Sequence, residues 1–276
     1  MRKIVVTGGA GRLARVVIEG LVAQNVSVLA VDSVRPEKLR CRFVRADLTD
    51  PAAVYDVLRG TDAILHLAAV PGPTIEASSA TFRNNVLSTF HIAEAAVNLG
   101  VPRIVFASSI FSLGWHEDPL AFWPRYVPVD EAHPLTPFES YGLSKATGEE
   151  ILATASRRSG ISVVSLRLMN IVHPEGYQGM PWPVPTNDHP ARFVMWPWID
   201  VRDAATACRL ALLASTTGFE AIYVAATETR FDAPTRDLLQ QFAPQVEIRG
   251  PLRGRTTVVS LEKARRLLGF EPAHHW

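Results

Sequence analysis

The sequence has only two cysteines in 276 residues, no long hydrophobic run and almost no net charge. Cys41 and Cys208 lie far apart, and Cys208 falls within an apolar helical pattern, so we expect both thiols to be reduced. The first apolar run, residues 4–6, is too short for the hydrophobic region of a signal peptide, and no run approaches the roughly 20 residues of a membrane span. We therefore expect a soluble, cytoplasmic protein.

The net charge of +1 argues against polyanionic partners. Proteins that bind nucleic acid or anionic membranes carry a strongly basic surface, so we expect neither partner. The histidines show no spacing with cysteines or acidic residues that is typical of a metal site, and we expect no metal. Hydrophobic residues make up 47% and charged residues 20%, the balance of a folded chain that can bury a sizeable core.

What the chain does have is a regular alternation of short apolar runs and amphipathic segments. Near-continuous apolar strands are typical of a parallel sheet that helices cover on both faces. The expected strands are 4–7, 26–32, 42–48, 62–69, 103–109 and 161–167, and the expected helices are 12–24, 52–59, 81–99 and 139–158. The pattern predicts an α/β fold with a doubly wound parallel sheet of the Rossmann type.

The alternation of apolar runs and amphipathic segments stops after the sixth expected strand. Prolines recur through residues 174–197, which excludes long helices and interior strands and predicts a long loop. Order resumes with a helix expected over 198–214 and a strand over 220–226. We expect residues 1–170 to form the main domain and residues 171–276 a smaller part integrated with it.

A glycine-rich turn, TGGAGRLA, follows the first expected strand directly. Gly9, Gly11 and Ala14 fit the GxGxxG/A pattern, in which the first glycines permit a tight turn and a close approach of the backbone to a pyrophosphate. The pyrophosphate then rests on the N-terminus of the following helix. Ala14 occupies the position needed for helix–strand packing, where a methyl group can be accommodated. The turn predicts dinucleotide binding.

An acidic residue ends the second expected strand at the place that this binding mode requires. Asp32 lies about 20 residues beyond the glycine turn, where a carboxylate accepts hydrogen bonds from the ribose hydroxyls of the adenosine. The same carboxylate would repel a 2′-phosphate, so NAD is favoured. Arg12 and Arg35 keep NADP as the less favoured alternative, because a nearby arginine accommodates that phosphate.

Tyr141 and Lys145 stand four positions apart in FESYGLSKATGEE. On a helix this spacing places both side chains on one face. A tyrosine has an ordinary pKa of about 10, and a neighbouring ammonium together with a positively charged nicotinamide favours its phenolate. Tyr141 is therefore a candidate general base.

With these motifs in order, the sequence resembles the extended short-chain dehydrogenases/reductases of the NAD-dependent epimerase/dehydratase family over nearly its whole length. The resemblance is carried by TGGAGRLA (7–14), Asp32, ADL (46–48), HLAA (66–69), NNVLST (84–89), FASS (106–109), YGLSK (141–145) and LRLMN (166–170). It implies that residues 1–170 are an NAD-binding Rossmann domain and that residues 171–276 bind the substrate.

The resemblance also implies a set of cofactor contacts. Asp47 and Leu48 would lie against the adenine, and Asn84 or Asn85 would face the cofactor near its nicotinamide. The cofactor-binding residues implied are Gly8, Gly11, Arg12, Leu13, Asp32, Asp47, Leu48, Leu67, Ala68, Ala69, Asn84, Tyr141, Lys145 and Met169.

The catalytic residues that the resemblance implies are Ser109, Tyr141 and Lys145. Ser109 would hydrogen-bond the reacting oxygen of the substrate, with Ser108 as the nearest alternative. Lys145 would hold the nicotinamide ribose and acidify Tyr141, which would move the hydroxyl proton. His66 ends an apolar strand, and we expect it to be a structural or cofactor-side histidine rather than a base.

Tryptophans follow two of the expected strands at their carboxyl ends, where open α/β sheets bind ligands. They are Trp115, Trp123, Trp182, Trp196 and Trp198. One hypothesis is an aromatic pocket that stacks on a sugar-like ring, and the alternative is that they pack the C-terminal part or a dimer contact. The residues expected at the substrate are Ser109, Asn170, His173 and Trp182.

The residues after the serine distinguish branches of the family. Dehydratases of the family have Thr, Asp and Glu where this chain has Ser109, Ile110 and Phe111, so dehydration is disfavoured. Epimerases of sugar nucleotides are usually longer. The short uronate dehydrogenases are closer in size, and RIVFASS resembles their sequence, but their Asn-His-Thr is replaced here by Ile110, Phe111 and Ser112.

We therefore expect an NAD-dependent oxidoreductase of carbohydrate metabolism that acts on a hydroxyl-bearing carbon of a sugar, sugar acid or sugar nucleotide. A sugar-nucleotide epimerase with tightly bound NAD is the first alternative. A protein that senses NAD(P) without turnover is the second. The resemblance also implies a homodimer through the helices expected at 81–99 and 139–158.

Overall fold

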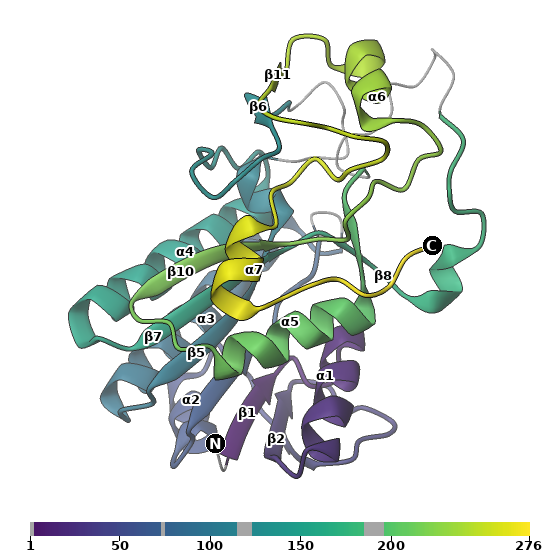
Figure 1. Cartoon of the computed structure of the whole chain (residues 1–276). Helices are drawn as coiled ribbons and strands as arrows, with labels where there is room; N and C mark the ends of the chain where they lie inside the picture. Colours follow the sequence, from purple (N-terminus) through teal and green to yellow (C-terminus); the bar gives the residue numbers. More distant parts are fainter. Residues whose placement is uncertain (1–2, 73–74, 115–122, 185–195) are drawn as a thin grey trace.

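The computed structural model describes residues 3–72, 75–114, 123–184 and 196–276. Its centre is a parallel sheet of seven strands in the order β10-β7-β5-β4-β1-β2-β3 (Figure 1). The strands are β1 (Lys3–Thr7), β2 (Ser27–Asp32), β3 (Arg42–Arg45), β4 (Ala63–His66), β5 (Arg103–Ser109), β7 (Ser162–Leu168) and β10 (Phe219–Val224). The predicted parallel α/β sheet is confirmed.

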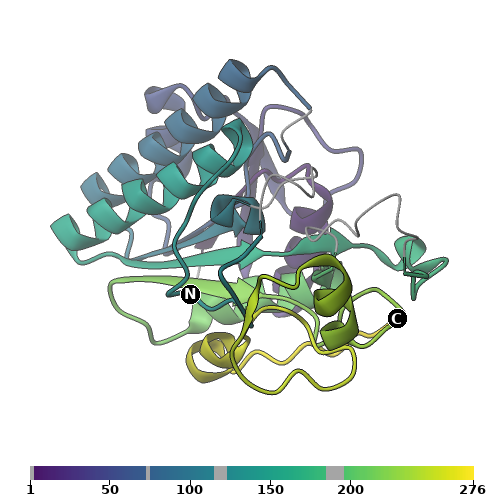
Figure 2. The ribbon, with the colours of Figure 1, turned by 90° about the horizontal axis from the view of Figure 1, so that it is seen from above.

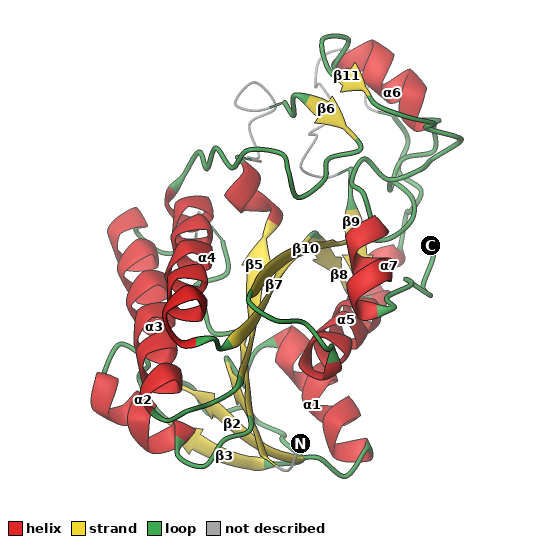
Figure 3. Ribbon diagram, turned by 60° about the vertical axis from the view of Figure 1, so that its left-hand side comes forward, coloured by secondary structure: helices red, strands yellow, loops and turns green. Residues whose placement is uncertain are grey.

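Helices cover both faces of the sheet (Figure 3). On one face lie α1 (Arg12–Ala23), α5 (Val201–Leu213) and α7 (Glu262–Leu268), and on the other lie α2 (Pro51–Leu58), α3 (Ser78–Asn98) and α4 (Ser140–Ser159). Strand β1 shows why its three central residues are all apolar. Ile4 and Val6 pack into the core under α1, while Val5 packs into the core on the opposite face.

Two of the expected strands are shorter than predicted at their carboxyl ends. The run expected over 62–69 leaves the sheet after His66, and the run expected over 42–48 leaves it after Arg45. In both cases the apolar residues beyond the strand line the cavity described below. An apolar run therefore indicates buried residues here, and the buried residues extend beyond the end of the hydrogen-bonded strand.

The residues after β7 form short elements above the main sheet. Strand β8 (Asn170–Val172) pairs with β9 (Trp198–Asp200), and a short 3-10 helix, η2 (Pro174–Tyr177), follows β8. The helix expected over 198–214 is therefore wrong in its first turn, because Asp200 caps α5 by accepting a hydrogen bond from the backbone N–H of Arg202 (2.7 Å). The proline-rich stretch is predicted correctly over its described residues, which contain no long helix. Residues 185–195 lie outside them.

A small upper part completes the molecule. Strand β6 (Tyr126–Val127) pairs with β11 (Glu247–Ile248) near helix α6 (Thr235–Phe242), and another short 3-10 helix, η1 (Ile110–Leu113), follows β5. Figure 2 shows the green and yellow C-terminal segments gathered together on one side of the molecule. These short strands and α6 have no counterpart in the sequence prediction. Within the described ranges, no helix is long and apolar enough to cross a bilayer.

Candidate active site

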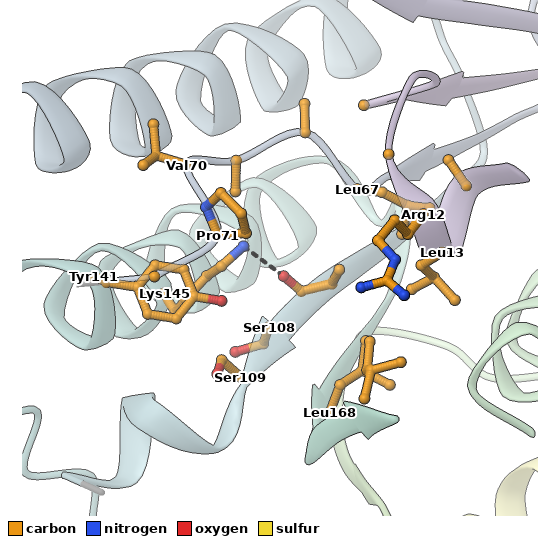
Figure 4. Close-up of a pocket in the computed structure, with 18 of the residues that line it drawn as sticks. Arg12, Leu13, Leu67, Val70, Pro71, Ser108, Ser109, Tyr141, Lys145 and Leu168 are labelled. Carbon is orange, nitrogen blue, oxygen red and sulfur yellow. Dashed lines mark hydrogen bonds between the residues drawn. The ribbon is translucent and has the colours of Figure 1, made fainter. Parts of the chain in front are cut away.

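A cavity of about 810 Å³ opens at the carboxyl edge of the sheet, where the chain leaves β1, β2, β4, β5 and β7 (Figure 4). The strand order reverses at β1, and in open α/β sheets such a switch point is where ligands bind. The cavity is lined by nearly all of the predicted site residues: Gly8, Gly11, Arg12, Leu13, Asp32, Asp47, Leu48, Leu67, Ala68, Ala69, Asn84, Ser109, Tyr141, Lys145, Met169, Asn170 and His173.

The glycine turn brings backbone, rather than side chains, to the cavity wall. Gly8 has a φ of +69°, and a Cβ at this position would lie 2.7 Å from the backbone N of Ala68. The N–H of Gly11 donates to the carbonyl of Gly8 (2.9 Å), which closes the turn before α1. Gly9 faces β2 instead, because a Cβ there would lie 2.8 Å from the Cβ of Ala30. Gly9 therefore packs against β2 and does not line the cavity, whereas Gly8 and Gly11 do.

Asp32 lies at the end of β2 with its carboxylate fixed by backbone donors. Its Oδ2 accepts from the N–H of Ala10 (3.0 Å) and its Oδ1 from the N–H of Val34 (3.1 Å). Each oxygen keeps further acceptor capacity toward the cavity. Of the two arginines considered for a 2′-phosphate, Arg12 lines the cavity but pairs with Glu175 on η2 (2.6 Å).

A buried polar network supports the floor of the cavity. His66 Nδ1 lies 2.7 Å from the hydroxyl of Thr7, and its Nε2 lies 3.1 Å from the hydroxyl of Thr89. Burial, aided by the charge of Lys145, lowers the pKa of His66 to about 3. The ring is therefore neutral at physiological pH and joins β1, β4 and α3, which is the structural role expected for it.

The two asparagines considered for the cofactor have separate positions. Asn84 lines the cavity. Asn85 is buried beneath it, where its Oδ1 accepts from the N–H of Val70 (2.8 Å) and its Nδ2 donates to Ser144 Oγ (3.0 Å). Asn85 therefore holds the loop after β4 against α4, and Asn84 is the one in position to contact a ligand.

Helix α4 begins where it can aim Tyr141 and Lys145 at the cavity. The carboxylate of Glu139 caps the helix by accepting from the N–H groups of Tyr141 and Gly142, both at 2.6 Å. Gly142 permits the close packing of α4 on η1, since a Cβ there would lie 2.4 Å from the carbonyl oxygen of Phe111. Figure 4 shows Tyr141 and Lys145 projecting from α4 toward the serines at the end of β5.

Burial displaces the pKa values of both α4 side chains toward their neutral forms. Burial raises the pKa of Tyr141 to about 12, although a hydrogen bond from Ser109 opposes the increase. Burial also lowers the pKa of Lys145 to about 7, although the charge of Glu149 opposes the decrease. Lys145 Nζ donates to the carbonyl oxygen of Ala107 (2.7 Å) and lies 5.6 Å from the centre of the Tyr141 ring. The phenol of the protein alone is therefore protonated at neutral pH.

The two serines at the end of β5 differ in their partners. Ser109 bonds with Tyr141, and its Oγ accepts from the N–H of Phe111 (3.2 Å). Ser108 Oγ is buried, and no described residue gives it a hydrogen-bond partner. Both serines line the cavity, but Ser109 is the one coupled to the candidate base. This geometry favours Ser109 over its nearest alternative.

Three residues after β7 close the far wall. Met169 is buried, whereas Asn170 on β8 is exposed, and His173 lines the cavity directly before η2. Burial, and secondarily the charge of Arg12, lowers the pKa of His173. Sequence reasoning missed several apolar wall residues, and the available signal was their position directly after expected strands. They include Val70, Pro71, Ile75, Ile110, Phe111, Leu168 and Ile171.

Of the two hypotheses for the tryptophans, the structure favours packing within the C-terminal part for three of them. Trp196 and Trp198 are fully buried, Trp196 against Phe231 (ring centres 6.4 Å apart). Trp123 packs on Trp196 (6.4 Å), so the alternative of packing within the C-terminal part holds for these three. Trp182 packs against Phe231 and is not among the described residues that line the cavity. Trp115 lies outside the described residues. Segments distant in sequence cover the rings, which local patterning does not reveal.

Comparison with known proteins agrees with this arrangement. A family model described as the NAD dependent epimerase/dehydratase family matches residues 4–226. The chain is 34% identical over 170 residues to a uronate dehydrogenase of Pseudomonas putida, covering 60% of each chain. It is 31% identical over 176 residues to a putative UDP-glucose 4-epimerase of Methanocaldococcus jannaschii, covering 61% of this chain and 55% of the relative. The aligned part therefore spans little more than half of these relatives.

Solved structures match over a greater length. A short-chain dehydrogenase/reductase superfamily protein from Agrobacterium tumefaciens with bound NAD superposes with a TM-score of 0.76 at 26% identity. The superposition covers 99% of this chain and 93% of the other. The chain thus shares its whole architecture, and not the nucleotide turn alone, with a protein that holds a dinucleotide.

Proposed function

Because the chain belongs to the NAD-dependent epimerase/dehydratase family, we propose that it is an oxidoreductase that transfers a hydride between NAD and a hydroxyl-bearing carbon of a sugar, sugar acid or sugar nucleotide. The observation that carries the proposal is that Ser109, Tyr141 and Lys145 line the same cavity as the glycine turn and Asp32. The activities named for the Pseudomonas and Methanocaldococcus relatives support a carbohydrate substrate.

The residues present fit a dinucleotide. Gly8 and Gly11 line the cavity without side chains where α1 begins, and this backbone wall suits a pyrophosphate at the N-terminus of the helix. Asp32 would hold the adenosine ribose, and Asp47 with Leu48 would border the adenine. The negative charge of Asp32 favours NAD over NADP.

The nicotinamide, when bound, accepts or supplies the hydride. Ser109 orients the substrate oxygen, and Tyr141 holds or moves the proton at that oxygen. Because burial alone keeps the phenol protonated, positive charge beside the ring is needed to release its proton. Lys145 supplies part of that charge from 5.6 Å, and its hydrogen bond to Ala107 fixes its position.

An epimerase with tightly bound NAD is the second candidate, favoured by the similarity to a putative UDP-glucose 4-epimerase. An epimerase returns the hydride to the same substrate and forms no net reduced cofactor. Release of NADH in proportion to oxidised sugar supports the dehydrogenase, and sugar interconversion without NADH supports the epimerase. A protein that only senses NAD has no need of a buried tyrosine–lysine pair, so the pair argues against that alternative.

The test is turnover by wild type and by Tyr141→Phe with NAD and a panel of neutral, acidic and nucleotide-linked sugars. We expect the variant to lose roughly 10²- to 10⁴-fold in kcat, the usual contribution of a positioned acid or base. Tyr55→Phe is the matched control, because Tyr55 lies on α2 and bonds Asn98. Equal kcat for Tyr141→Phe and wild type contradicts the proposed role.

Two further expectations belong to this proposal. A homodimer through α3 and α4 is supported by the exposed apolar side chains Leu87, Phe90 and Leu143 on those helices. A cytoplasmic location is supported by the two cysteines, which are both free thiols.

A further inference from the structure

Arg230, in the segment after β10, is only 2% exposed, and none of the acidic residues that the structure describes forms an ion pair with it. Its Nε and Nη2 are enclosed, and no described residue accepts a hydrogen bond from either. Glu228 and Asp232, two positions away on each side, pair with Arg255 instead (3.6 and 3.3 Å). A buried guanidinium without an anion is costly, and proteins seldom retain one unless something binds it.

The guanidinium is held in place by an aromatic ring. Its central carbon lies 4.7 Å from the centre of the Trp182 ring, which packs edge-on against Phe231 (6.2 Å). Two backbone hydrogen bonds, from Trp182 N–H to the Arg230 carbonyl (2.8 Å) and from Asp232 N–H to the Trp182 carbonyl (2.9 Å), join the two segments. Trp182 is itself only half-buried, so the ring that stacks on the Arg230 guanidinium reaches the protein surface.

The unpartnered edge of Arg230 is the one with which other arginines of this protein hold carboxylates. Arg167 grips Glu149 through Nε (3.0 Å) and Nη2 (2.7 Å). Arg202 grips Asp200 through the same two nitrogens (2.8 and 2.9 Å). This fork matches the two coplanar oxygens of a carboxylate or phosphate. Arg230 presents the same fork, in a buried setting where an anion is bound most strongly.

A backbone hydrogen bond links Arg230 to the strand pair β8–β9, which borders the cavity. The N–H of Arg230 donates to the carbonyl of Trp196 (3.3 Å), and β9 begins two residues later at Trp198. Trp198 pairs in register with Asn170, which lines the cavity. The segment that carries Arg230 is thus linked through Trp196 and β9 to β8, whose Asn170 lines the cavity.

We propose that Arg230, held against Trp182, is a subsite for an anionic group of the substrate, a carboxylate or a phosphate on the sugar. The proposal rests on the proposed function and narrows its substrate class to acidic sugars. In this proposal Trp182 positions Arg230, which binds the anionic group, and does not itself stack on the sugar ring in the main cavity.

Turnover by Arg230→Met separates the acidic sugars from the neutral ones. With NAD, we expect wild type to prefer uronic acids or sugar phosphates, and the more active of the two classes identifies the anion. Arg230→Met should lose at least 100-fold in kcat/KM for that class, mainly through KM, while its rates with neutral sugars stay unchanged. Arg249→Met is the matched control, because Arg249 also stacks on an aromatic ring (3.7 Å from the centre of Tyr126) but is exposed and paired with Glu247.

Thermal unfolding tests the same site without turnover. Inorganic phosphate and glucuronate should each be tried as probes, and at least one should raise the Tm of wild type and Arg249→Met but not that of Arg230→Met. The free Arg230→Met protein should unfold at an equal or higher Tm than free wild type, because an unpaired buried charge has been removed. A lower Tm together with undiminished protection by the probe assigns Arg230 a purely structural role and overturns the proposal.

The outcomes separate this site from the proposed activity. Anion protection that depends on Arg230, without NADH formation from any sugar, keeps the subsite and refutes the oxidoreductase. NADH formation from neutral sugars that is equal in wild type and Arg230→Met, with no preference for acids, keeps the oxidoreductase and refutes the subsite. If Arg230→Met does not fold, the same unfolding measurements are made on Arg230→Lys, which retains the positive charge but lacks the two-pronged guanidinium. Anion protection at least fivefold weaker than in wild type supports the proposal. Undiminished anion protection overturns it.

Discussion

Tyr141, Lys145 and His66 all have pKa values displaced by burial toward the neutral form. At the scale of single residues, the cavity floor is therefore a region where the protein alone discourages charge. The arrangement suits a site whose positive charge arrives with a cofactor, because that charge then acts in surroundings that screen it poorly.

His66 makes this property measurable in the stability of the protein. Its folded pKa of about 3 lies below its ordinary value of 6.5. Above pH 6.5 both folded and unfolded states are neutral at this residue, and it adds no pH dependence. As the pH falls from 6.5 toward 3, the unfolded chain takes up a proton that the folded chain refuses, so the free energy of unfolding decreases by up to about 1.4 kcal/mol per pH unit.

Urea unfolding between pH 4.5 and 7.5 measures this dependence. His66→Gln retains a donor and an acceptor toward Thr7 and Thr89, but it cannot titrate. We expect a shallower loss of stability below pH 6.5 in this variant than in wild type. Parallel curves for the two proteins would show that the acid sensitivity comes from other groups, such as His133, whose pKa is also lowered by burial.

At the scale of elements, the turn between β1 and α1 is fixed by two demands that only glycine meets at position 8. The backbone there has a positive φ, and the loop after β4 passes against it. The glycine turn is thus packed directly against the chain that leaves β4 after His66. Leu67 in that chain lines the same cavity.

A pair of glycine substitutions separates the two demands. Gly60 has a similar φ of +63°, but a Cβ there meets nothing within 4 Å. Gly60→Ala should cost roughly 1–2 kcal/mol of stability, the price of the left-handed conformation alone, and leave NAD binding unchanged. Gly8→Ala should cost more and weaken NAD binding at least tenfold, because the turn must move away from Ala68.

Chemical denaturation and calorimetric titration with NAD provide these two measurements. Equal stability losses for Gly8→Ala and Gly60→Ala would mean that the contact with the loop after β4 yields easily. Undiminished NAD affinity in Gly8→Ala would place the pyrophosphate elsewhere than on this turn.

At the scale of the whole molecule, the helices on the two faces of the sheet differ in how many large apolar side chains they expose to solvent. Helices α3 and α4 lie side by side on one face of the sheet (Figure 3), and both present large apolar side chains outward. On the opposite layer, Leu213 near the end of α5 is an isolated exposed leucine. Contiguous apolar surface is more typical of an interface than are single residues.

The proposed dimer predicts a difference between these surfaces. Phe90→Asp should convert the protein to a monomer in sedimentation velocity, because it buries a carboxylate in the interface. Leu213→Asp, on the other layer, should leave the oligomeric state unchanged. A Phe90→Asp protein that sediments as wild type does would exclude α3 from the interface.

The sequence by itself determined the features that depend on local spacing. The apolar runs located the seven strands of the main sheet, since both faces of a parallel sheet are buried and the strands need no alternation. Gly8, Gly11 and Asp32 converge because strand, turn and helix follow one another directly, and Tyr141 meets Lys145 because a helix repeats every 3.6 residues.

Only the tertiary structure decided what depends on contacts between distant segments. Trp196 is buried by residues that follow β10, and Asn85 is removed from the cavity by its bonds to the loop after β4 and to α4. Arg230 has acidic neighbours in the sequence, yet both pair with Arg255 in the fold. Burial and ion pairing are properties of surfaces brought together by folding, and no pattern within one segment encodes which surfaces will meet.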